Sequence, residues 1–273
     1  DGGTRLRLVV DVLMKVGRLA CRHDLLSVPP RGQVPNRFRV NAAERVRHST
    51  TAPLVGACAG ATGPGGTMTS MTGQPDHYFT AAPASAEERR PVRMRLAGRD
   101  VEVQVAGGVF SPGGVDKGTA VLLDEVPDPP EEGVFLDLGC GWGPIALTLG
   151  LLRPRADVWA VDVNERALDL TRTNAAALGL DRIHVALPEQ VPDDTRYDLI
   201  WSNPPIRIGK PALHDLLRTW LSRLRPGGHA YLVVSKNLGG DSLQRWIDTE
   251  LGLPCTRYAS AKGFRILAVT SPA

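Results

Sequence analysis

The residues best suited to chemistry in this chain are Asn203, Pro204 and Pro205, which follow an apolar run. Two consecutive prolines remove two N–H donors and stiffen the turn, so we expect the Asn203 amide oxygen and the Pro204 carbonyl to project as acceptors. Two such acceptors can hold the hydrogens of a planar NH2 group and favour a pyramidal nitrogen, whose lone pair then points at an electrophilic carbon. The motif therefore predicts catalysis on an exocyclic amine by orientation and electrostatics, without a strong base.

A second stretch has the pattern of a nucleotide-type site: an apolar strand, a glycine-rich turn, a helix and another apolar strand. The turn reads Asp137-x-Gly139-x-Gly141-x-Gly143, and Asp162 ends the second strand. Glycines permit a tight turn and close approach of a ligand, and a carboxylate at this strand end can accept both hydroxyls of a ribose. The spacing differs from the dinucleotide fingerprint, and the absence of a following lysine excludes a phosphate-binding P-loop.

The elements that must position these residues alternate along the chain. Strands are expected at 133–138, 157–162, 182–186, 196–202, 228–235, 253–258 and 264–270. Helices are expected near 143–152, 164–178, 209–224 and 239–250. This alternation predicts an α/β, Rossmann-like fold with a mostly parallel seven-stranded sheet and helices on both faces. The glycine turn, Asp162 and Asn203 then all lie at the carboxyl ends of strands, where such sheets bind ligands.

The rest of the chain divides into two further regions. Residues 1–76 are rich in Gly, Ala, Thr and Ser and are expected to be disordered or a non-native extension, with a native start at Met68 or Met71. Residues 77–125 are expected to form a β-rich entry module that packs against the main sheet, because Val92 to Leu96 and Val101 to Val105 alternate as a β-hairpin does. Residues 126–273 are expected to form the main domain.

Five motifs occur in a recognisable order. They are Gly108-Val109-Phe110-Ser111, Val115-Asp116-Lys117-Gly118-Thr119, the Leu136–Gly143 loop, the run from Val161 to Ala167, and Ser202-Asn203-Pro204-Pro205 with Gly209. From His77 to about Val269 the chain resembles the class I S-adenosylmethionine (SAM) methyltransferases that modify guanine N2 in bacterial small-subunit ribosomal RNA. The motifs are specific for methyltransferase and less specific for the substrate.

The resemblance implies SAM as cofactor and ribosomal RNA or the small ribosomal subunit as partner. Asn203, Pro204 and Pro205 would be catalytic. The expected cofactor contacts are Phe110, Thr119, Asp137, Gly139, Cys140, Gly141, Gly143, Asp162, Val163, Glu189 and Asn203. Glu189 is included because it follows the third strand, where class I enzymes contact adenine.

The chain departs from the family pattern at one informative position. Residue 206 is Ile, where related enzymes carry an aromatic that would stack on the target base; Phe110, Trp142 or Trp201 could supply a surface instead. Larger relatives also carry a second domain that helps to hold RNA. Methylation of protein glutamine, DNA adenine or a small amine therefore stays open, and so does an inactive SAM-binding scaffold.

Composition bounds the function classes. The four cysteines are scattered without a C-x-x-C pair, which argues against a metal site or disulfide framework and fits the cytoplasm. No apolar run is long enough to span a bilayer. Residues 1–67 hold 10 Lys/Arg and 4 Asp/Glu of the chain's 32 and 29, so the remainder is mildly acidic. Overall charge thus gives no support for a nucleic-acid partner, and the oligomeric state is not indicated.

Overall fold

The computed structural model describes residues 88–273, and the fold below refers to that part of the chain. The expectations for residues 1–76, including the start at Met68 or Met71, lie outside the described residues, as does the beginning of the segment 77–125. Among residues 88–273, no helix is long and apolar enough to cross a membrane.

Seven strands form one sheet in the order β5-β4-β3-β6-β7-β9-β8. The neighbours from β5 to β7 are parallel, whereas β9 runs antiparallel to both β7 and β8. The strands are β3 (Val134–Leu138), β4 (Asp157–Val161), β5 (Ile183–Ala186), β6 (Tyr197–Ser202), β7 (Leu224–Ser235), β8 (Cys255–Ala261) and β9 (Phe264–Thr270). The predicted Rossmann-like fold with a mostly parallel seven-stranded sheet is confirmed.

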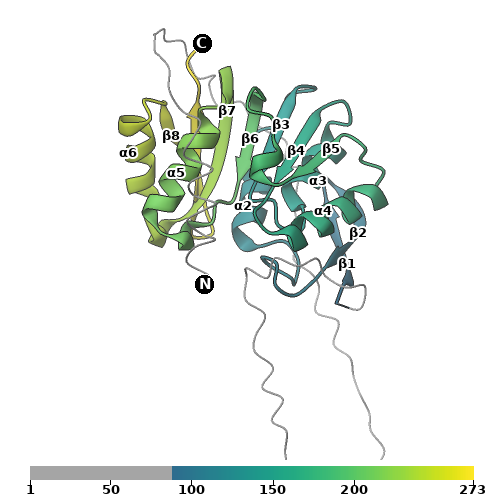
Figure 1. The fold of residues 1–273 in the computed structure, drawn as a ribbon. Coiled ribbons are helices and arrows are strands. Elements are labelled where there is room, and N and C mark those ends of the chain that lie inside the picture. Colours follow the sequence, from purple (N-terminus) through teal and green to yellow (C-terminus); the bar gives the residue numbers. More distant parts are fainter. Residues whose placement is uncertain (1–87) are drawn as a thin grey trace, which may run out of the picture.

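Helices lie on both faces of this sheet, as Figure 1 shows. They are α2 (Lys117–Glu125), α3 (Pro144–Leu152), α4 (Glu165–Ala177), α5 (Lys210–Leu221) and α6 (Gly240–Glu250). Because side chains alternate along a strand, Leu136 and Ile200 pack in the core beneath α5 and α6, whereas Phe135 and Trp201 pack with α2 and α3. Short 3-10 turns, η1 (Pro188–Gln190), η2 (Ile206–Ile208) and η3 (Lys236–Leu238), follow β5, β6 and β7.

Helix α4 begins and ends where the sequence predicts. The Asn164 side chain accepts hydrogen bonds from the N–H groups of Arg166 and Ala167 and so caps the first turn. At the other end Gly179 has a φ of 65°, a left-handed conformation that glycine adopts without strain. These local signals place α4, which carries part of the site described below.

The predicted hairpin exists, but it packs differently from our expectation. Strands β1 (Arg90–Leu96) and β2 (Arg99–Val105) form their own two-stranded sheet. Their apolar side chains pack on α3 and α4 rather than on the main sheet. Figure 1 accordingly places the hairpin beside α4, at the opposite end of the molecule from α6 and β8. The two helices leave an apolar outer surface, so the hairpin covers helices and forms a further layer.

Two other differences have local causes. Helix α2, which the sequence placed in the entry module, packs directly on the sheet, with Val121, Leu122 and Leu123 in its core. Strand β7 begins four residues before the predicted 228, at Leu224, and the Pro226-Gly227-Gly228 turn lies inside it as an irregularity opposite β6. A Cβ at Gly228 would lie 2.9 Å from the Arg225 carbonyl oxygen, so the strand passes this point only with glycine.

Candidate active site

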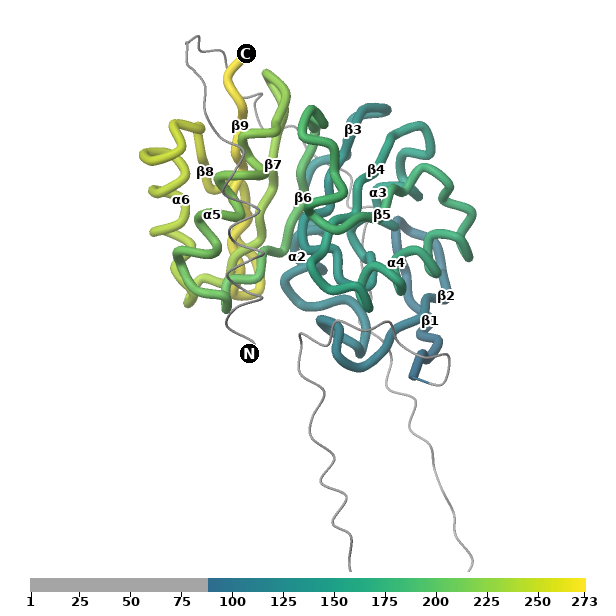
Figure 2. Tube along the Cα trace, viewed as in Figure 1, coloured from purple at the N-terminus to yellow at the C-terminus, as the bar shows by residue number. Residues whose placement is uncertain are grey.

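The two chemically interesting stretches meet in the middle of the sheet. Strands β4, β3 and β6 are adjacent, as the trace in Figure 2 shows. Leu138 at the end of β3 pairs with Ser202 at the end of β6, and the Ser202 hydroxyl donates to the Leu138 carbonyl oxygen at 2.7 Å. Gly139 and Asn203, each one residue further on, therefore leave the sheet side by side. The structure brings the glycine turn and the Asn-Pro-Pro motif together, as their places at strand ends predict.

The glycine turn has the backbone conformation that its residue types require. Gly139, Gly141 and Gly143 have φ values of 78°, 57° and 96°, all in the left-handed region. The N–H groups of Gly139 and Cys140 both donate to the Val161 carbonyl oxygen, at 2.8 and 3.1 Å. The turn is thus tied to the end of β4, immediately beside Asp162.

Thr171 of α4 closes the turn from the outside. Its hydroxyl donates to the Gly141 carbonyl oxygen at 2.9 Å. A Cβ on Gly143 would lie only 3.0 Å from Thr171 Cγ2, so α4 and the turn are in close contact. Thr171 is fully buried. In the sequence, only a place on the inner face of a predicted helix marks Thr171.

Asp162 serves the protein backbone on both of its oxygens. Oδ2 accepts from the Gly141 N–H and Oδ1 from the Asn164 N–H, each at 2.9 Å. Burial raises the pKa of Asp162, and the hydrogen bonds from the backbone oppose that rise. A carboxylate has about four lone-pair sites, which exceeds the number that the backbone uses here, so a ribose hydroxyl can bind while the glycine turn stays held.

Asp137 is the buried carboxyl beneath the turn. Its side chain has no exposure, and Oδ2 accepts from the Ala146 N–H in the first turn of α3 at 2.9 Å. Oδ1 has no hydrogen-bond partner among the described residues. Burial raises the pKa of Asp137 to about 8, the Ala146 N–H lowers it, and the nearby Asp162 raises it. An unpartnered buried carboxylate oxygen next to a glycine turn fits a cationic ligand group such as the ammonium of SAM.

The other expected cofactor contacts differ in how deeply they are buried. Cys140 is buried in the turn, and burial raises the pKa of its thiol well above the usual value, so it is a packed thiol rather than a nucleophile. Val163 follows Asp162 and is exposed, Glu189 lies exposed in η1 after β5, and Phe110 is 41% exposed in the loop before α2. Contact of these residues with the cofactor stays a prediction.

The loop that carries Phe110 is tied to the start of α4. Asn164 Nδ2 donates to the Gly108 carbonyl oxygen at 3.1 Å, and Arg166 Nη1 donates to the Gly107 carbonyl oxygen at 2.9 Å. Arg166 is 5% exposed, and its guanidinium also pairs with Glu88. Asn164 therefore both caps α4 and fixes this loop beside Val163 and the end of β4.

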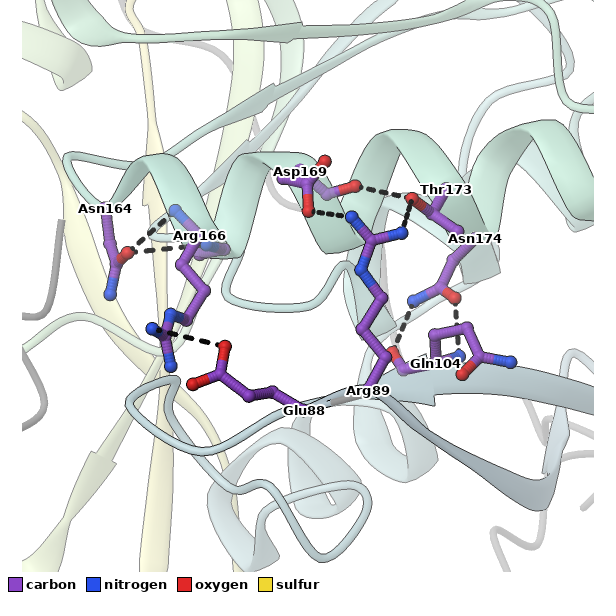
Figure 3. Close-up of polar contacts among 9 residues, drawn as sticks. Glu88, Arg89, Gln104, Asn164, Arg166, Asp169, Thr173 and Asn174 are labelled. Atoms are coloured by element: carbon purple, nitrogen blue, oxygen red, sulfur yellow. Dashed lines mark hydrogen bonds and ion pairs between the residues drawn. The ribbon is translucent and has the colours of Figure 1, made fainter. Parts of the chain in front are cut away.

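A second set of contacts fastens the N-terminal strands to the rest of α4 (Figure 3). Arg89 reaches Asp169 and Thr173. Asn174, which is 1% exposed, accepts from the Gln104 N–H at 2.7 Å and donates to the carbonyl oxygens of Gln104 and Trp142, both at 3.0 Å. Since Trp142 belongs to the glycine turn, one buried amide joins the hairpin, α4 and the turn.

Asn203 is oriented by two acceptors at the start of α2. Its Nδ2 donates to Asp116 Oδ2 at 3.0 Å and to Thr119 Oγ1 at 3.1 Å. A carboxylate can only accept, which fixes the NH2 end of the amide on this side. The Asn203 Oδ1 atom receives no hydrogen bond from any residue of the range 88–273 and so stays available as an acceptor. Thr119, expected near the cofactor, contacts the Asn203 side chain here.

The two prolines give a more restricted turn than expected. The Pro204 carbonyl oxygen already accepts the Ile206 N–H at 2.8 Å, and the Pro205 carbonyl oxygen accepts the Ile208 N–H at 3.1 Å. Pro204 retains one lone pair for a substrate, because a carbonyl oxygen has two. The first of these contacts turns Ile206 back towards the core.

Ile206 does not occupy a stacking position. It packs against the core beneath α5 and α6. Trp142 and Trp201, the suggested replacements, are 1% and 2% exposed and so cannot offer a face to a ligand. Phe264, at the start of β9, lies closer to the chemistry. A Cβ on Gly118 would lie 3.1 Å from Phe264 Cε1 and 3.3 Å from Asn203 Nδ2, so ring and amide border the same small space. The sequence analysis did not identify Phe264.

The described side chains offer no metal centre. Among residues 88–273, no group of three or more His, Cys, Asp or Glu side chains is placed to hold a metal ion. The site consists of a glycine turn, two carboxylates and an oriented amide. These groups suit a cationic nucleoside cofactor and an amine.

Comparisons with known proteins agree with this geometry. The family model described as "Methyltransferase small domain" matches residues 100–268. The chain is 35% identical to ribosomal RNA small subunit methyltransferase C of Pseudomonas entomophila (strain L48) over 201 residues, 71% of this chain and 58% of the relative. It is 32% identical to the uncharacterized protein YbxB of Bacillus subtilis (strain 168) over 170 residues, 61% of this chain and 85% of the relative.

A solved structure supports the fold. The T. thermophilus 16S rRNA N2 methyltransferase RsmC, solved with AdoMet and guanosine, superimposes with a TM-score of 0.60 at 24% identity, over 70% of this chain and 52% of the other. The chain spans about half the length of the curated methyltransferase C relatives that it matches. The fold is that of a class I methyltransferase, and the chain belongs to the methyltransferase small domain family.

Proposed function

We propose that this chain transfers a methyl group from SAM to an exocyclic amine, and that the amine is guanine N2 of small-subunit ribosomal RNA. The observation that carries the proposal is the orientation of Asn203, whose NH2 is held by Asp116 and Thr119 and whose Oδ1 is left as an acceptor. That acceptor leaves the sheet beside the glycine turn. An amine held at Asn203 thus lies next to the cofactor site.

Two carboxylates, Asp162 and Asp137, would bind different parts of SAM. When bound, SAM supplies an activated methyl group on a sulfonium. Asp162 holds the glycine turn through Gly141 and offers its remaining lone pairs to the ribose hydroxyls. The unpartnered oxygen of Asp137 would accept a hydrogen bond from the ammonium group. Gly139 and Gly141 have positive φ values that favour glycine, and the lack of a side chain at both positions would let the cofactor approach the backbone.

Asn203 acts on the acceptor nitrogen. An exocyclic amine is a weak nucleophile because its lone pair is conjugated with the ring. Hydrogen bonds from its two N–H groups to Asn203 Oδ1 and the Pro204 carbonyl oxygen favour a pyramidal nitrogen and stabilise the positive charge that develops on it. The proton leaves after transfer, so no residue of this chain has to act as a strong base.

The choice of guanine N2 rests on the relatives and on the aromatic side chains near Asn203. The methyltransferase C relatives are named for small-subunit ribosomal RNA, and the T. thermophilus structure holds guanosine. Phe264 beside Asn203 and the exposed Phe110 provide flat apolar surfaces that suit a planar base. They replace the aromatic that Ile206 does not supply.

The test is a transfer assay with tritiated SAM and separate substrate pools. We would incubate the chain with small ribosomal subunits, with naked small-subunit RNA and with ribosomal protein, all from cells that lack this gene. Asn203→Ala is the matched control. We expect label in the RNA of one pool, and nucleoside mass spectrometry should identify it as N2-methylguanosine.

Other outcomes would separate the parts of the proposal. Label in protein glutamine or on the amine of another nucleoside would contradict guanine as the substrate but support methylation of an amine. Label on an oxygen or a carbon atom would contradict the proposal that the chain methylates an amine. SAM binding without transfer to any pool would contradict the proposed enzyme activity and favour a binding scaffold.

A further inference from the structure

Asp116 makes two hydrogen bonds with one carboxylate oxygen. Its Oδ2 accepts from the Gly118 N–H at 2.8 Å and from Asn203 Nδ2 at 3.0 Å. The first bond caps α2, as an aspartate at this position commonly does. The second joins residues 87 positions apart in the chain. The same oxygen thus ties the start of α2 to the turn that follows β6.

The space around this contact is tight at Gly118, the second residue of α2, where a Cβ atom would displace its neighbours. A Cβ on Gly118 would lie 3.0 Å from Asp116 Oδ2, 3.3 Å from Asn203 Nδ2 and 3.1 Å from Phe264 Cε1. Gly118 has an ordinary helical conformation, so alanine would favour the helix itself. Glycine at this place is explained by the close approach of Asp116 to Asn203 rather than by the helix.

The two acceptors at the start of α2 use both hydrogens of the Asn203 amide. Asp116 takes one and Thr119 Oγ1, which is nearly fully buried, takes the other at 3.1 Å. With both donors occupied, a rotation that exchanged the amide oxygen and nitrogen would set the oxygen against the Asp116 carboxylate. The pair therefore defines which end of Asn203 faces a substrate.

We propose that Asp116 is the positioning residue for Asn203, and this rests on the proposed function. Asp116 does not touch the substrate. It acts by holding the amide so that Oδ1 accepts a hydrogen from the amine, and its negative charge strengthens that oxygen as an acceptor through the intervening NH2 group. The role predicts a loss in kcat without a loss in SAM affinity.

The proposal changes the expectation for Asn203→Asp. An aspartate at position 203 keeps an oxygen that can accept a hydrogen bond from the amine. If that were the only role of the residue, Asn203→Asp should be more active than Asn203→Ala. Its second oxygen, however, would stand about where Nδ2 lies now, 3.0 Å from Asp116 Oδ2. Two carboxylates at that separation repel each other. We therefore expect Asn203→Asp to be no better than Asn203→Ala.

The decisive variants are Asp116→Ser and Asp116→Asn. Serine caps a helix about as well as aspartate but is one bond too short to reach Asn203. Asparagine keeps the length and the acceptor and loses only the charge. With tritiated SAM and small-subunit RNA we expect Asp116→Ser to lower kcat by about 10- to 100-fold. Asp116→Asn should lose less than about 5-fold, because orientation and not charge is the main effect.

A double-variant cycle separates positioning from a general structural role. If Asp116 acts through Asn203, Asp116→Ser should have no further effect on the residual single-turnover rate in an Asn203→Ala background. Calorimetry should give a SAM Kd within about twofold of the parent, as expected for a residue that leaves the cofactor site unchanged. A substrate-free readout is the NMR signal of the Asn203 NH2 group, whose slow hydrogen exchange should be lost in Asp116→Ser and kept in Asp116→Asn.

The outcomes distinguish this inference from the proposed function. Normal kcat in Asp116→Ser beside a disabled Asn203→Ala would overturn the positioning role alone. An equal loss from Asp116→Ser in both backgrounds would overturn it too, as would an Asp116→Asn variant as inactive as Asp116→Ser. Normal kcat in Asn203→Ala would instead remove the proposed function.

Discussion

Replacing Asp137 by asparagine should stabilise the cofactor-free protein at neutral pH. Asp137 is fully buried, and its pKa in the folded protein is about 8, against an ordinary value of 3.8. Between these two values the folded protein keeps the proton that the unfolded chain has lost. The contribution of Asp137 to the free energy of unfolding therefore falls as the pH rises from about 4 to about 8, and it is constant outside that range.

The size of the effect follows from the shift. One pKa unit corresponds to about 1.4 kcal/mol, so a shift of about four units costs roughly 6 kcal/mol in full, of which about 4 falls between pH 5 and pH 8. The asparagine side chain of the Asp137→Asn variant would keep an oxygen for the Ala146 N–H and carry no titrating proton. Its contribution to the free energy of unfolding should not change across this range.

The assay is urea unfolding of the parent and Asp137→Asn at a series of pH values. We expect the difference in unfolding free energy to grow by about 4 kcal/mol in favour of the variant from pH 5 to pH 8. Saturating SAM should reduce the difference, because its ammonium favours the charged carboxylate, and the variant should bind SAM less tightly. Parallel pH profiles for the two proteins without SAM would refute the assignment of a protonated, buried Asp137.

Two further substitutions test the hydrogen bonds that hold the glycine turn and the hairpin in place. Asp162→Ala should weaken SAM binding by about 1.5–3 kcal/mol, or roughly 10- to 150-fold in Kd. The substitution removes hydrogen bonds to a charged group and leaves the Gly141 N–H without its acceptor. Calorimetry that gave an unchanged affinity in a folded variant would show that the cofactor binds elsewhere. Asn174→Ala should lower the free energy of unfolding by about 2–4 kcal/mol, since it leaves buried groups of Gln104 and Trp142 without partners. A urea midpoint equal to that of the parent would show that the hairpin does not depend on this amide.

The sequence predicts the sheet well because its signals are local. Apolar runs, the Asn164 cap and the Gly179 end of α4 depend on neighbours in the chain, and all three are confirmed. The meeting of the glycine turn with Asn203 is equally predictable, because parallel strands end at the same edge of a sheet. The order of the motifs also indicates the residues around the start of α2, including Thr119.

The missed features are contacts between distant segments. Nothing local to Asp116 indicates that its carboxylate serves Asn203, and nothing local to Phe264 indicates a place beside the same amide. The hairpin was placed on the wrong layer because its alternation shows which face is apolar and not what covers it. The sequence shows that residue 206 lacks the aromatic side chain of its relatives, but not that Ile206 packs against the core beneath α5 and α6.

The most direct test of the account is the single-turnover rate of Asn203→Ala on small-subunit RNA with SAM bound. Removing one preorganised acceptor should slow the appearance of N2-methylguanosine by about 10²- to 10³-fold. The SAM Kd should stay within about twofold, because the proposed mechanism uses Asn203 for the amine, although the family resemblance also gave it as a cofactor contact. A near-normal rate of N2-methylguanosine formation in this variant would contradict the proposed mechanism, even with the cofactor site confirmed.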